Sequence, residues 1–371
     1  MPSRREALAL VGGTALTGAF GGCTDILGGG GDTLTIASSP TPTFQAEMRY
    51  VTEQTDIADA VMEEAGYEYD LNMTWDARSL FLGGNADLVP SNSTIEAAGM
   101  VENQGLDVTV TSKRTPQHTG LYVREGGAYD PDVAGGKQAA IDNLVDDQAN
   151  FGIGGWGLST IPAYRIIFSE KYGYEFDPDG DFNVFTAEFP ALARLLADQE
   201  IAAGGSGPPY NLWDFRNELK PLFWMQVEMM DLGFPGDVLG ISNGVTQTAF
   251  AEENPEAIKA YLAILKHVSE HMQENLEEVA QDPEIQETLG AGSAEEAQWF
   301  LAFRYRAENS PNEFPATLTE MELTDEHVEA ERNALSEATD LGALEGSWED
   351  GLSFEQYDLT EYLDVAAEAA E

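Results

Sequence analysis

The chain has 371 residues, of which 43% are hydrophobic, and it contains 17 Phe, 13 Tyr and 6 Trp. That length exceeds one ordinary core and predicts two lobes of about 100 to 200 residues each. The aromatic content argues against a disordered acidic chain. The 66 Asp and Glu outnumber the 18 Lys and Arg, for a net charge of -48 at pH 7. Nucleic acid and anionic membranes are therefore disfavoured as partners, because no Lys/Arg stripe is present to neutralise phosphates.

The same charge indicates a high-salt habitat. At ordinary ionic strength a net charge of -48 destabilises the compact state by self-repulsion. At about 1 M salt the Debye length falls to about 3 Å, and this repulsion is screened. We therefore expect a halophilic protein of haloarchaeal type.

The first 23 residues have the order of a twin-arginine signal. Arg4-Arg5 precedes an apolar stretch from residue 7 to residue 20, and Gly21-Gly22-Cys23 follows. This stretch is shorter than the about 20 residues that a transmembrane helix needs, so a cleaved signal is favoured. The sequence predicts export of a folded protein.

Cys23 is the only cysteine in the chain. It stands where a lipoprotein signal places its modified residue, so we predict lipid attachment at Cys23. An incidental cysteine behind an ordinary signal is the alternative. Residues 24–32 contain four consecutive glycines and predict a flexible tether from the membrane.

Strands followed by polar turns and helices recur in the first part of the mature chain. Residues 33–37 alternate like a strand and lead into Ser38-Ser39-Pro40-Thr41-Pro42, and residues 55–64 carry a helical pattern. A second strand at residues 86–89 leads into Pro90-Ser91-Asn92-Ser93. Ser93 and Glu96 predict a capping box ahead of the next helix. Residues 107–111 predict a further strand.

The pattern continues through the middle of the chain. Strands are predicted at residues 119–123 and 150–153, and helices near Pro162 and over residues 190–198. Residues 238–242 resemble a returning strand. A long amphipathic helix begins after Asn254, whose side chain is predicted to cap it. This alternation predicts an α/β fold with mostly parallel sheets.

Two motifs admit catalytic or cofactor interpretations. Residues 152–157 satisfy G-x-G-x-x-G, but Trp156 crowds the place where a pyrophosphate needs bare backbone, so a glycine-rich ligand loop is favoured over a dinucleotide site. His267 and His271 match H-x-x-E-H, but they lie within the long amphipathic helix, where a polar face without metal explains them. We expect no cofactor, no metal and no catalytic residue.

Polar loops rich in small residues follow several predicted strands. In open α/β sheets ligands bind outside the C-terminal strand ends, where helix N-termini and hydroxyls accept polar groups. These loops predict a site that binds a ligand without catalysing a reaction. They are Ser38-Ser39-Pro40-Thr41, Pro90-Ser91-Asn92-Ser93, residues 156–160 and residues 204–210.

These segments together resemble the substrate-binding proteins of ABC importers for nitrate, sulfonates and taurine, which are related to those for the pyrimidine precursor of thiamine. The resemblance extends from about Thr33 to Asp364. Its segments are residues 80–88 (helix, glycines, Ala-Asp strand), residues 154–163 (glycine/serine loop), residues 189–203, and Asn254-Pro255-Glu256 ahead of a helix.

The resemblance implies a bilobal, periplasmic-binding-protein-like fold of type II, in which two crossing strands join two α/β lobes. We divide the chain into the signal (1–23), tether (24–32), first part of lobe 1 (33–117), lobe 2 (118–236), and a return to lobe 1 with a helical C-terminus (237–371). The implied protein is a monomer outside the cell, held to the cytoplasmic membrane by lipid and delivering a small molecule to ABC permease subunits. The predicted ligand contacts are Ser39, Thr41, Ser91, Ser93, Trp156, Ser159, Thr160, Ser206, Tyr210 and Trp224.

Two ligand classes remain open at the level of sequence. A small anion would use hydroxyls and helix N-termini, with Arg165, Arg216 or Lys137 as counter-charge. A flat heterocycle would stack on aromatic faces, for which Trp156, Tyr210, Trp213 and Trp224 are candidates. We favour the anion. An exported enzyme or a cell-surface interaction protein on the same fold is the other class of function.

Overall fold

The structure is a computed structural model, and it describes residues 32–156, 158, 160–188, 191–206, 212–306 and 315–370. The described chain is α/β and contains two mixed sheets, here named sheet A and sheet B. The predicted fold class is therefore confirmed. The predicted signal, Cys23 and residues 24–31 of the predicted tether lie outside the described residues, whereas Asp32, placed last in the tether, is the first residue of β1.

Sheet A has the strand order β11-β4-β10-β3-β1-β2. Its strands are β1 (Asp32–Ser38), β2 (Tyr67–Met73), β3 (Leu88–Asn92), β4 (Val108–Thr115), β10 (Ser242–Gln247) and β11 (Leu352–Phe354). β1 is parallel to β2 and β3, whereas β10 is antiparallel to both β3 and β4. The C-terminal ends of β1, β3 and β4 therefore share one edge with the start of β10.

Sheet B has the strand order β7-β6-β8-β5-β9. Its strands are β5 (Gly120–Arg124), β6 (Phe151–Ile153), β7 (Val184–Thr186), β8 (Ala203–Ser206) and β9 (Leu219–Trp224). β6 is parallel to β7 and β8, and β5 is antiparallel to β8 and β9. The ends of β6, β8 and β9 therefore share an edge with the start of β5.

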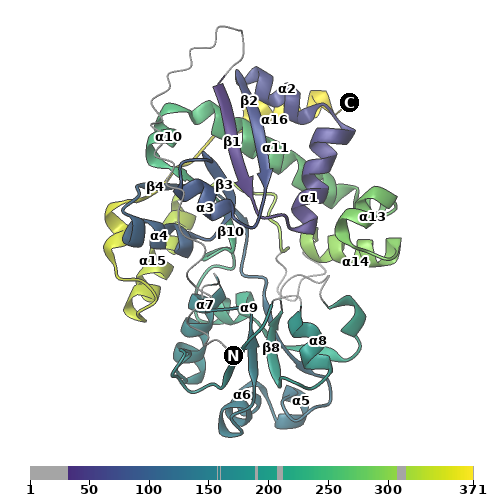
Figure 1. Ribbon diagram of the computed structural model, residues 1–371, viewed down its shortest axis with the longest axis vertical. Coiled ribbons are helices and arrows are strands. Elements are labelled where there is room, and N and C mark those ends of the chain that lie inside the picture. The colour runs from purple at the N-terminus through teal and green to yellow at the C-terminus, as the bar shows by residue number, and fades with distance from the viewer. Residues whose placement is uncertain are drawn as a thin grey trace, which may run out of the picture. The chain divides into compact units, whose positions relative to one another are not determined.

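Helices pack against both sheets. Figure 1 shows α2, α11 and α16 beside β1 and β2, and α5, α6 and α8 around β8. The α-helices are α1 (Pro42–Arg49), α2 (Ile57–Glu64), α3 (Ala77–Leu82), α4 (Thr94–Gln104), α5 (Pro131–Ala134), α6 (Lys137–Asp146), α7 (Thr160–Ile166), α8 (Leu192–Ala197), α9 (Met225–Asp231), α10 (Thr248–Glu253), α11 (Pro255–Glu274), α12 (Leu276–Val279), α13 (Pro283–Leu289), α14 (Ala294–Tyr305), α15 (Asp325–Asp340) and α16 (Thr360–Ala369).

The alternation along β1 separates two hydrophobic layers. Leu34 and Ile36 pack with α1, α2 and α11, whereas Ala37 packs on the opposite face with residues of α3 and α4. Fully burying one such aliphatic side chain contributes about 1.5–3 kcal/mol. This packing holds the β1 end and the start of α1 in place beside the end of β3.

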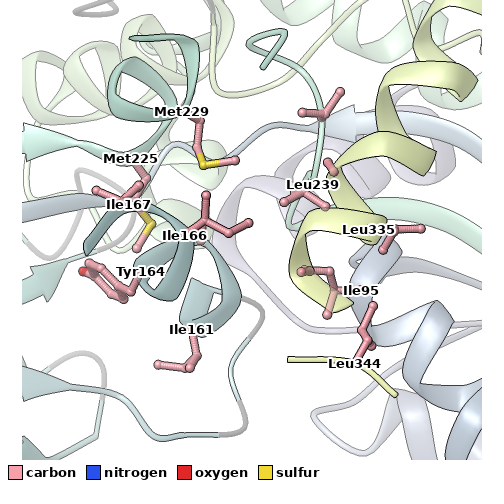
Figure 2. Packing of buried hydrophobic residues seen from close by; sticks show 14 of the residues in the cluster. Ile95, Ile161, Tyr164, Ile166, Ile167, Met225, Met229, Leu239, Leu335 and Leu344 are labelled. Carbon is pink, nitrogen blue, oxygen red and sulfur yellow. The ribbon is translucent and has the colours of Figure 1, made fainter. Parts of the chain in front are cut away.

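A continuous apolar cluster joins the helices of the two sheets. Figure 2 shows two groups of this cluster, one with Ile161 and Ile166 of α7 and Met229 of α9, the other with Leu239 and with Leu335 of α15. All five side chains are buried. On this side of the molecule the elements around sheet A and sheet B are therefore in direct apolar contact.

The structure confirms the capping box and corrects two local predictions. Ser93 and Glu96 bond reciprocally. Asn254 does not cap α11; its side chain accepts a hydrogen bond from the Tyr67 hydroxyl at 3.0 Å. The returning strand predicted at residues 238–242 is wrong, because β10 begins at Ser242. Leu239 instead has a φ of 48°, and its amide donates to the Glu331 carboxylate at 3.0 Å.

Candidate functional site

The polar turn after β1 meets the end of β3. The Ser39 amide donates to the Ser91 hydroxyl oxygen at 3.3 Å, so two of the predicted ligand contacts are adjacent. Thr41 follows at the N-cap of α1, where its side chain caps no amide and is half-buried. These three residues lie at the shared edge of sheet A.

Ser93 is also at this edge, but its hydroxyl already has partners. It accepts from the Glu96 amide at 3.1 Å and lies 3.1 Å from the Glu96 carboxylate, and the residue is 1% exposed. The capping box thereby orients α4 and ends β3 sharply. Within the described structure Ser93 positions its helix, while ligand contact by Ser93 stays a prediction.

The backbone carbonyls of these turns are occupied. Ser38 O accepts from the Thr74 amide at 2.8 Å, Ser39 O from the Thr41 amide at 2.8 Å, and Ser93 O from Ala97 at 3.0 Å. Because the Ser91 hydroxyl oxygen also accepts a hydrogen bond, its own proton is directed elsewhere. Three carbonyls at this edge are therefore already bonded, while the Ser91 hydroxyl still has a proton to donate.

The corresponding edge of sheet B is aromatic. Gly120 pairs with Ser206 of β8 on one side and with Trp224 of β9 on the other. The Trp224 ring lies edge-on to Tyr122, with ring centroids 5.7 Å apart. Ser206 and Trp224, both predicted ligand contacts, therefore lie on either side of Gly120 on three neighbouring strands.

The remaining predicted contacts in this half are only partly described. Trp156 is half-buried and tilted against Phe176, with ring centroids 5.4 Å apart. Thr160 is the first residue of α7 and is 9% exposed. Ser159 and Tyr210 lie outside the described residues, as does the side chain of Ser206.

Two hydrogen-bonded crossings join the edges of the sheets. Residues 116–119 link β4 to β5, which limits the separation of Thr115 and Gly120 to about 18 Å. The return from β9 to β10 runs beside this link: the Gln226 amide donates to Gln117 O at 3.1 Å, and Gln117 Nε2 donates to Leu239 O at 2.9 Å. The polar edge of sheet A and the aromatic edge of sheet B are therefore held near each other.

Helix α14 contacts the aromatic edge of sheet B through two rings one turn apart. Phe303 lies 5.4 Å from Trp224, and Trp299 lies 5.4 Å from Trp213, between ring centroids. The opposite face of α14 buries Phe300 and Leu301 in the core beside sheet A. The helix therefore bridges the two halves.

The basic side chains expected to balance an anion have partners. Arg165 bonds Asp177 at 2.5 Å, and Lys137 bonds Glu228 at 2.5 Å. Arg216 stacks on the Trp213 ring at 3.7 Å and bonds its carbonyl. Their assignment as counter-charges stays a prediction that the structure weakens.

Buried titratable groups occupy both crossings. Burial, with a contribution from Arg304, lowers the pKa of His118 to about 3, and the ring lies 6.3 Å from Phe303. Glu331 of α15 lies against the other crossing, where it accepts from the Leu239 amide, and burial raises its pKa to about 7. Its neighbour His327 lies 3.4 Å from Asp237, which also binds Lys113 at 2.6 Å.

The dinucleotide and metal interpretations of the sequence gain no support. Trp156 is packed against Phe176 in the loop that satisfies the glycine motif. His271 stacks on Tyr50 with ring centroids 3.9 Å apart. Among the described residues, no group of three or more His, Cys, Asp or Glu side chains is arranged to hold a metal ion, and none of the helices described has the length and apolar character required to cross a membrane.

No protein-family model matches the sequence, and a comparison with curated proteins finds no match. Solved structures match most of the chain. The periplasmic aliphatic sulphonate binding protein SsuA from Escherichia coli has a TM-score of 0.59 at 12% identity, covering 91% of this chain and 99% of that one. The periplasmic nitrate-binding protein NrtA from Synechocystis PCC 6803 has a TM-score of 0.55 at 13% identity, covering 91% and 89%.

A third similar structure is the ligand binding component of an ABC-type import system from Staphylococcus aureus, with zinc bound. Its TM-score is 0.55 at 11% identity, covering 91% of this chain and 99% of that one. At such identities the likeness establishes the fold. The chain has a periplasmic-binding-protein-like fold.

Sequence reasoning missed several residues of this region. Asn92 lies in one of the loops predicted to bind a ligand, but the prediction there named only Ser91 and Ser93. Asn243, His118, Trp299 and Phe303 were also missed, because only tertiary contacts bring β10, the crossing and α14 to the same place. The spacing of Trp299 and Phe303, one helical turn apart, is the one signal that was available.

Proposed function

We propose that this chain is an extracytoplasmic solute-binding protein that delivers a small oxyanion, of the sulfonate or nitrate kind, to an ABC importer. The observation that carries the proposal is the edge of sheet A, where three backbone carbonyls are already bonded and the Ser91 hydroxyl keeps a proton to donate. An oxyanion supplies only acceptors, so it complements such a surface. Similarity to a sulphonate-binding, a nitrate-binding and an ABC-import protein supports the same role.

The proposed mechanism is binding by closure, without catalysis. The ligand would contact Ser39 and Ser91 on sheet A and the loops around Trp156, Thr160 and Ser206 on sheet B. The proposed closure would rotate the two halves about the crossings at residues 116–119 and 225–241. Closure follows from tighter binding of the ligand to the closed state, since a ligand shifts an equilibrium only by its differential affinity.

A second candidate ligand is a flat heterocycle such as an aminopyrimidine. The aromatic edge of sheet B favours it, because the partly exposed rings of Trp224 and Phe303 lie together beside Gly120. A ring stacked there would gain apolar contact that a nitrate ion cannot use.

The experiment is a thermal-shift screen of the mature domain in about 2 M KCl, because salt at molar concentration screens the repulsion between the carboxylates. The panel is taurine, methanesulfonate, nitrate and 4-aminopyrimidine, followed by calorimetry and recovery of the compound. We expect saturable one-to-one stabilisation by an oxyanion that is recovered unchanged. Consumption of the compound would indicate an enzyme instead.

The export and anchoring that we propose need a separate test. Mass spectrometry of the protein from its native membrane should find a lipid adduct on Cys23 as the new N-terminus. A Cys23→Ser variant should be released into the medium. Equal retention of both proteins at the membrane would contradict the lipid anchor.

A further inference from the structure

Two segments of the chain match the acceptor motif for N-linked glycans, which is Asn-x-Ser/Thr with x other than Pro. They are Asn72-Met73-Thr74 and Asn92-Ser93-Thr94. In this modification a sugar is attached to the asparagine side chain, and the motif marks surface segments of secreted proteins. A three-residue motif also occurs by chance, so the accessibility of each asparagine decides whether it is able to react.

The second of these motifs is buried. Asn92 is 4% exposed, Ser93 1% and Thr94 0%, and the Asn92 Nδ2 atom lies inside the fold. The Thr94 hydroxyl accepts a hydrogen bond from Asn243 Nδ2 at 2.8 Å, and the Ser93 hydroxyl accepts one from the Glu96 amide at 3.1 Å. An enzyme that acts on the folded chain therefore has no access to this asparagine.

The first motif lies at the surface. Asn72 is a partly exposed residue of β2, the last strand in the order of sheet A. Its Nδ2 donates to the Asp70 carboxylate at 3.3 Å on the exposed side of the strand. The Thr74 hydroxyl accepts from the Asp76 amide at 3.1 Å, also at the surface, and Trp75 between them is 74% exposed. Both the acceptor nitrogen and the hydroxyl of this motif are therefore accessible.

The Asn72 side chain lies on the face of sheet A opposite α1. Leu71 and Met73, on either side of it in β2, pack against the core that includes α1. Because side chains alternate along a strand, Asn72 is on the other face. Its partner in β1, Ala37, packs on that face too, and the register of β1 with β2 is regular. A glycan on Asn72 is therefore compatible with ligand binding at the turn before α1.

We infer that Asn72, and not Asn92, carries an N-linked glycan that is added outside the cytoplasm. The inference goes beyond the proposed function but rests on the export that this function includes. The predicted twin-arginine signal exports a folded chain, so only an asparagine on the folded surface is able to react. In the reaction Asn72 Nδ2 loses one proton and forms a bond to C1 of a sugar. The bond from C1 to the oxygen of a lipid phosphate donor breaks, and the lipid phosphate leaves with the electron pair.

The test is mass spectrometry of the protein purified from its native membrane. Trypsin places the two motifs on separate peptides, residues 50–78 and 79–113, because it cleaves at Arg78 between them. We expect the first peptide to carry a mass increment made of sugar units, located on Asn72 by electron-transfer fragmentation. The second peptide should have its unmodified mass. Protein made in the cytoplasm of a host without the glycan transferase provides the unmodified mass of both peptides.

Substitutions separate recognition of the motif from effects on folding. Asn72→Gln removes the acceptor, and Thr74→Ala removes the hydroxyl that the motif requires, so both should abolish the increment. Thr74→Ser keeps a hydroxyl and should retain it. Asn103→Gln is the matched control, because Asn103 is exposed but stands outside any such motif, and it should leave the glycan on Asn72 unchanged.

An unmodified Asn72 in exported protein that has lost its signal would overturn the inference and leave the proposed function intact. A glycan on Asn92 would also overturn it, because the acceptor would then be selected before the chain folds. If the protein stays in the cytoplasm with residues 1–23 uncleaved, the proposed extracytoplasmic role fails and the inference fails with it.

Discussion

The edges of sheet A and sheet B that the crossings join differ in chemistry. At sheet A the strand ends carry Ser38, Asn92, Thr115 and Asn243, all buried and polar. At sheet B the central position is Gly120, and its surroundings are aromatic. One edge therefore specifies hydrogen bonds, whereas the other provides apolar surface and close packing.

This difference indicates that, in the binding site that we propose, the two halves would contribute unequal parts. Hydrogen bonds fix the orientation of a polar group, and aromatic surfaces exclude water around it. Helix α14 adds to the second role, since Phe303 contacts Trp224 while Phe300 is anchored beside sheet A. Ligand selectivity should therefore depend mainly on sheet A, and the stability of the closed form mainly on the aromatic side.

The largest effect is expected at Gly120, which tests the close packing of sheet B. A Cβ at this position would lie 2.7 Å from the Tyr122 ring and 3.3 Å from the Trp224 ring. Gly120→Ala should lower the free energy of unfolding by about 2 to 3 kcal/mol, because buried rings must shift. This free energy is measured by denaturant unfolding in about 2 M KCl, where charge repulsion is screened.

The matched control is Gly99→Ala in the interior of α4, where a Cβ meets nothing closer than 3.8 Å. That change should raise stability by about 0.5–1 kcal/mol, since glycine is a poor helix former. If Gly120→Ala were as well tolerated as Gly99→Ala, sheet B would not be close-packed at its edge and the contrast with sheet A would be lost.

The next effect concerns His118, on the crossing between the two edges. Because its pKa is about 3 in the fold, below the ordinary 6.5, folding keeps the ring neutral. The stability that depends on neutral His118 is present above pH 6.5 and is lost as the pH falls toward 3. Between pH 7 and pH 5 this amounts to about 2 kcal/mol.

His118→Gln should remove that part of the acid sensitivity, measured as the unfolding free energy between pH 7 and pH 5. His267→Gln is the comparison: burial lowers the pKa of His267 too, but this residue of α11 is only half-buried, so its replacement should remove a smaller part of the acid sensitivity. If the unfolding free energies of the wild type and His118→Gln changed with pH in parallel, His118 would be solvated in the folded protein. The crossing between the two edges would then contain water.

Glu331, which contacts the returning crossing, should make the protein less stable as the pH rises, the opposite of the effect expected for His118. Its pKa of about 7 exceeds the ordinary 4.5, so the fold favours the protonated acid. The stability that this provides is complete below pH 4.5 and is lost as the pH rises through 7. Glu331→Gln, which keeps an acceptor for the Leu239 amide, should gain about 1 to 2 kcal/mol over the wild type at pH 8.

The control for Glu331→Gln is Glu329→Gln on the exposed face of the same helix, α15. It should change the unfolding free energy by no more than about 0.5 kcal/mol. A gain that did not vary with pH would show that Glu331 does not bury a titrating carboxyl at this crossing.

The smallest effect is expected for the polar edge itself. Ser93→Ala removes one half of the capping box of α4 and should cost about 1 kcal/mol of unfolding free energy. Ser336→Ala, an exposed helical serine of α15, should be neutral or slightly stabilising. A larger loss of ligand affinity than of stability in Ser93→Ala would assign Ser93 a direct ligand contact as well.

Local patterns predicted much of the sheet A edge. The Ser93 and Glu96 spacing predicted its capping box because both partners lie within one helical turn. The polar turns after β1 and β3 were predicted for the same reason, since strand, turn and helix follow one another directly in the chain. The burial of Asn92 was not predicted, because burial depends on what surrounds a residue in three dimensions.

The amino-acid sequence by itself determined the α/β class, the polar turns after β1 and β3, and the amphipathic α11, because each depends on residues close together in the chain. Only the tertiary structure decided that β10 starts at Ser242, that α14 reaches Trp224, and that Arg165 and Lys137 are paired with carboxylates. These features depend on partners more than ten residues away. Periodicity and local propensity carry no information about such distant contacts.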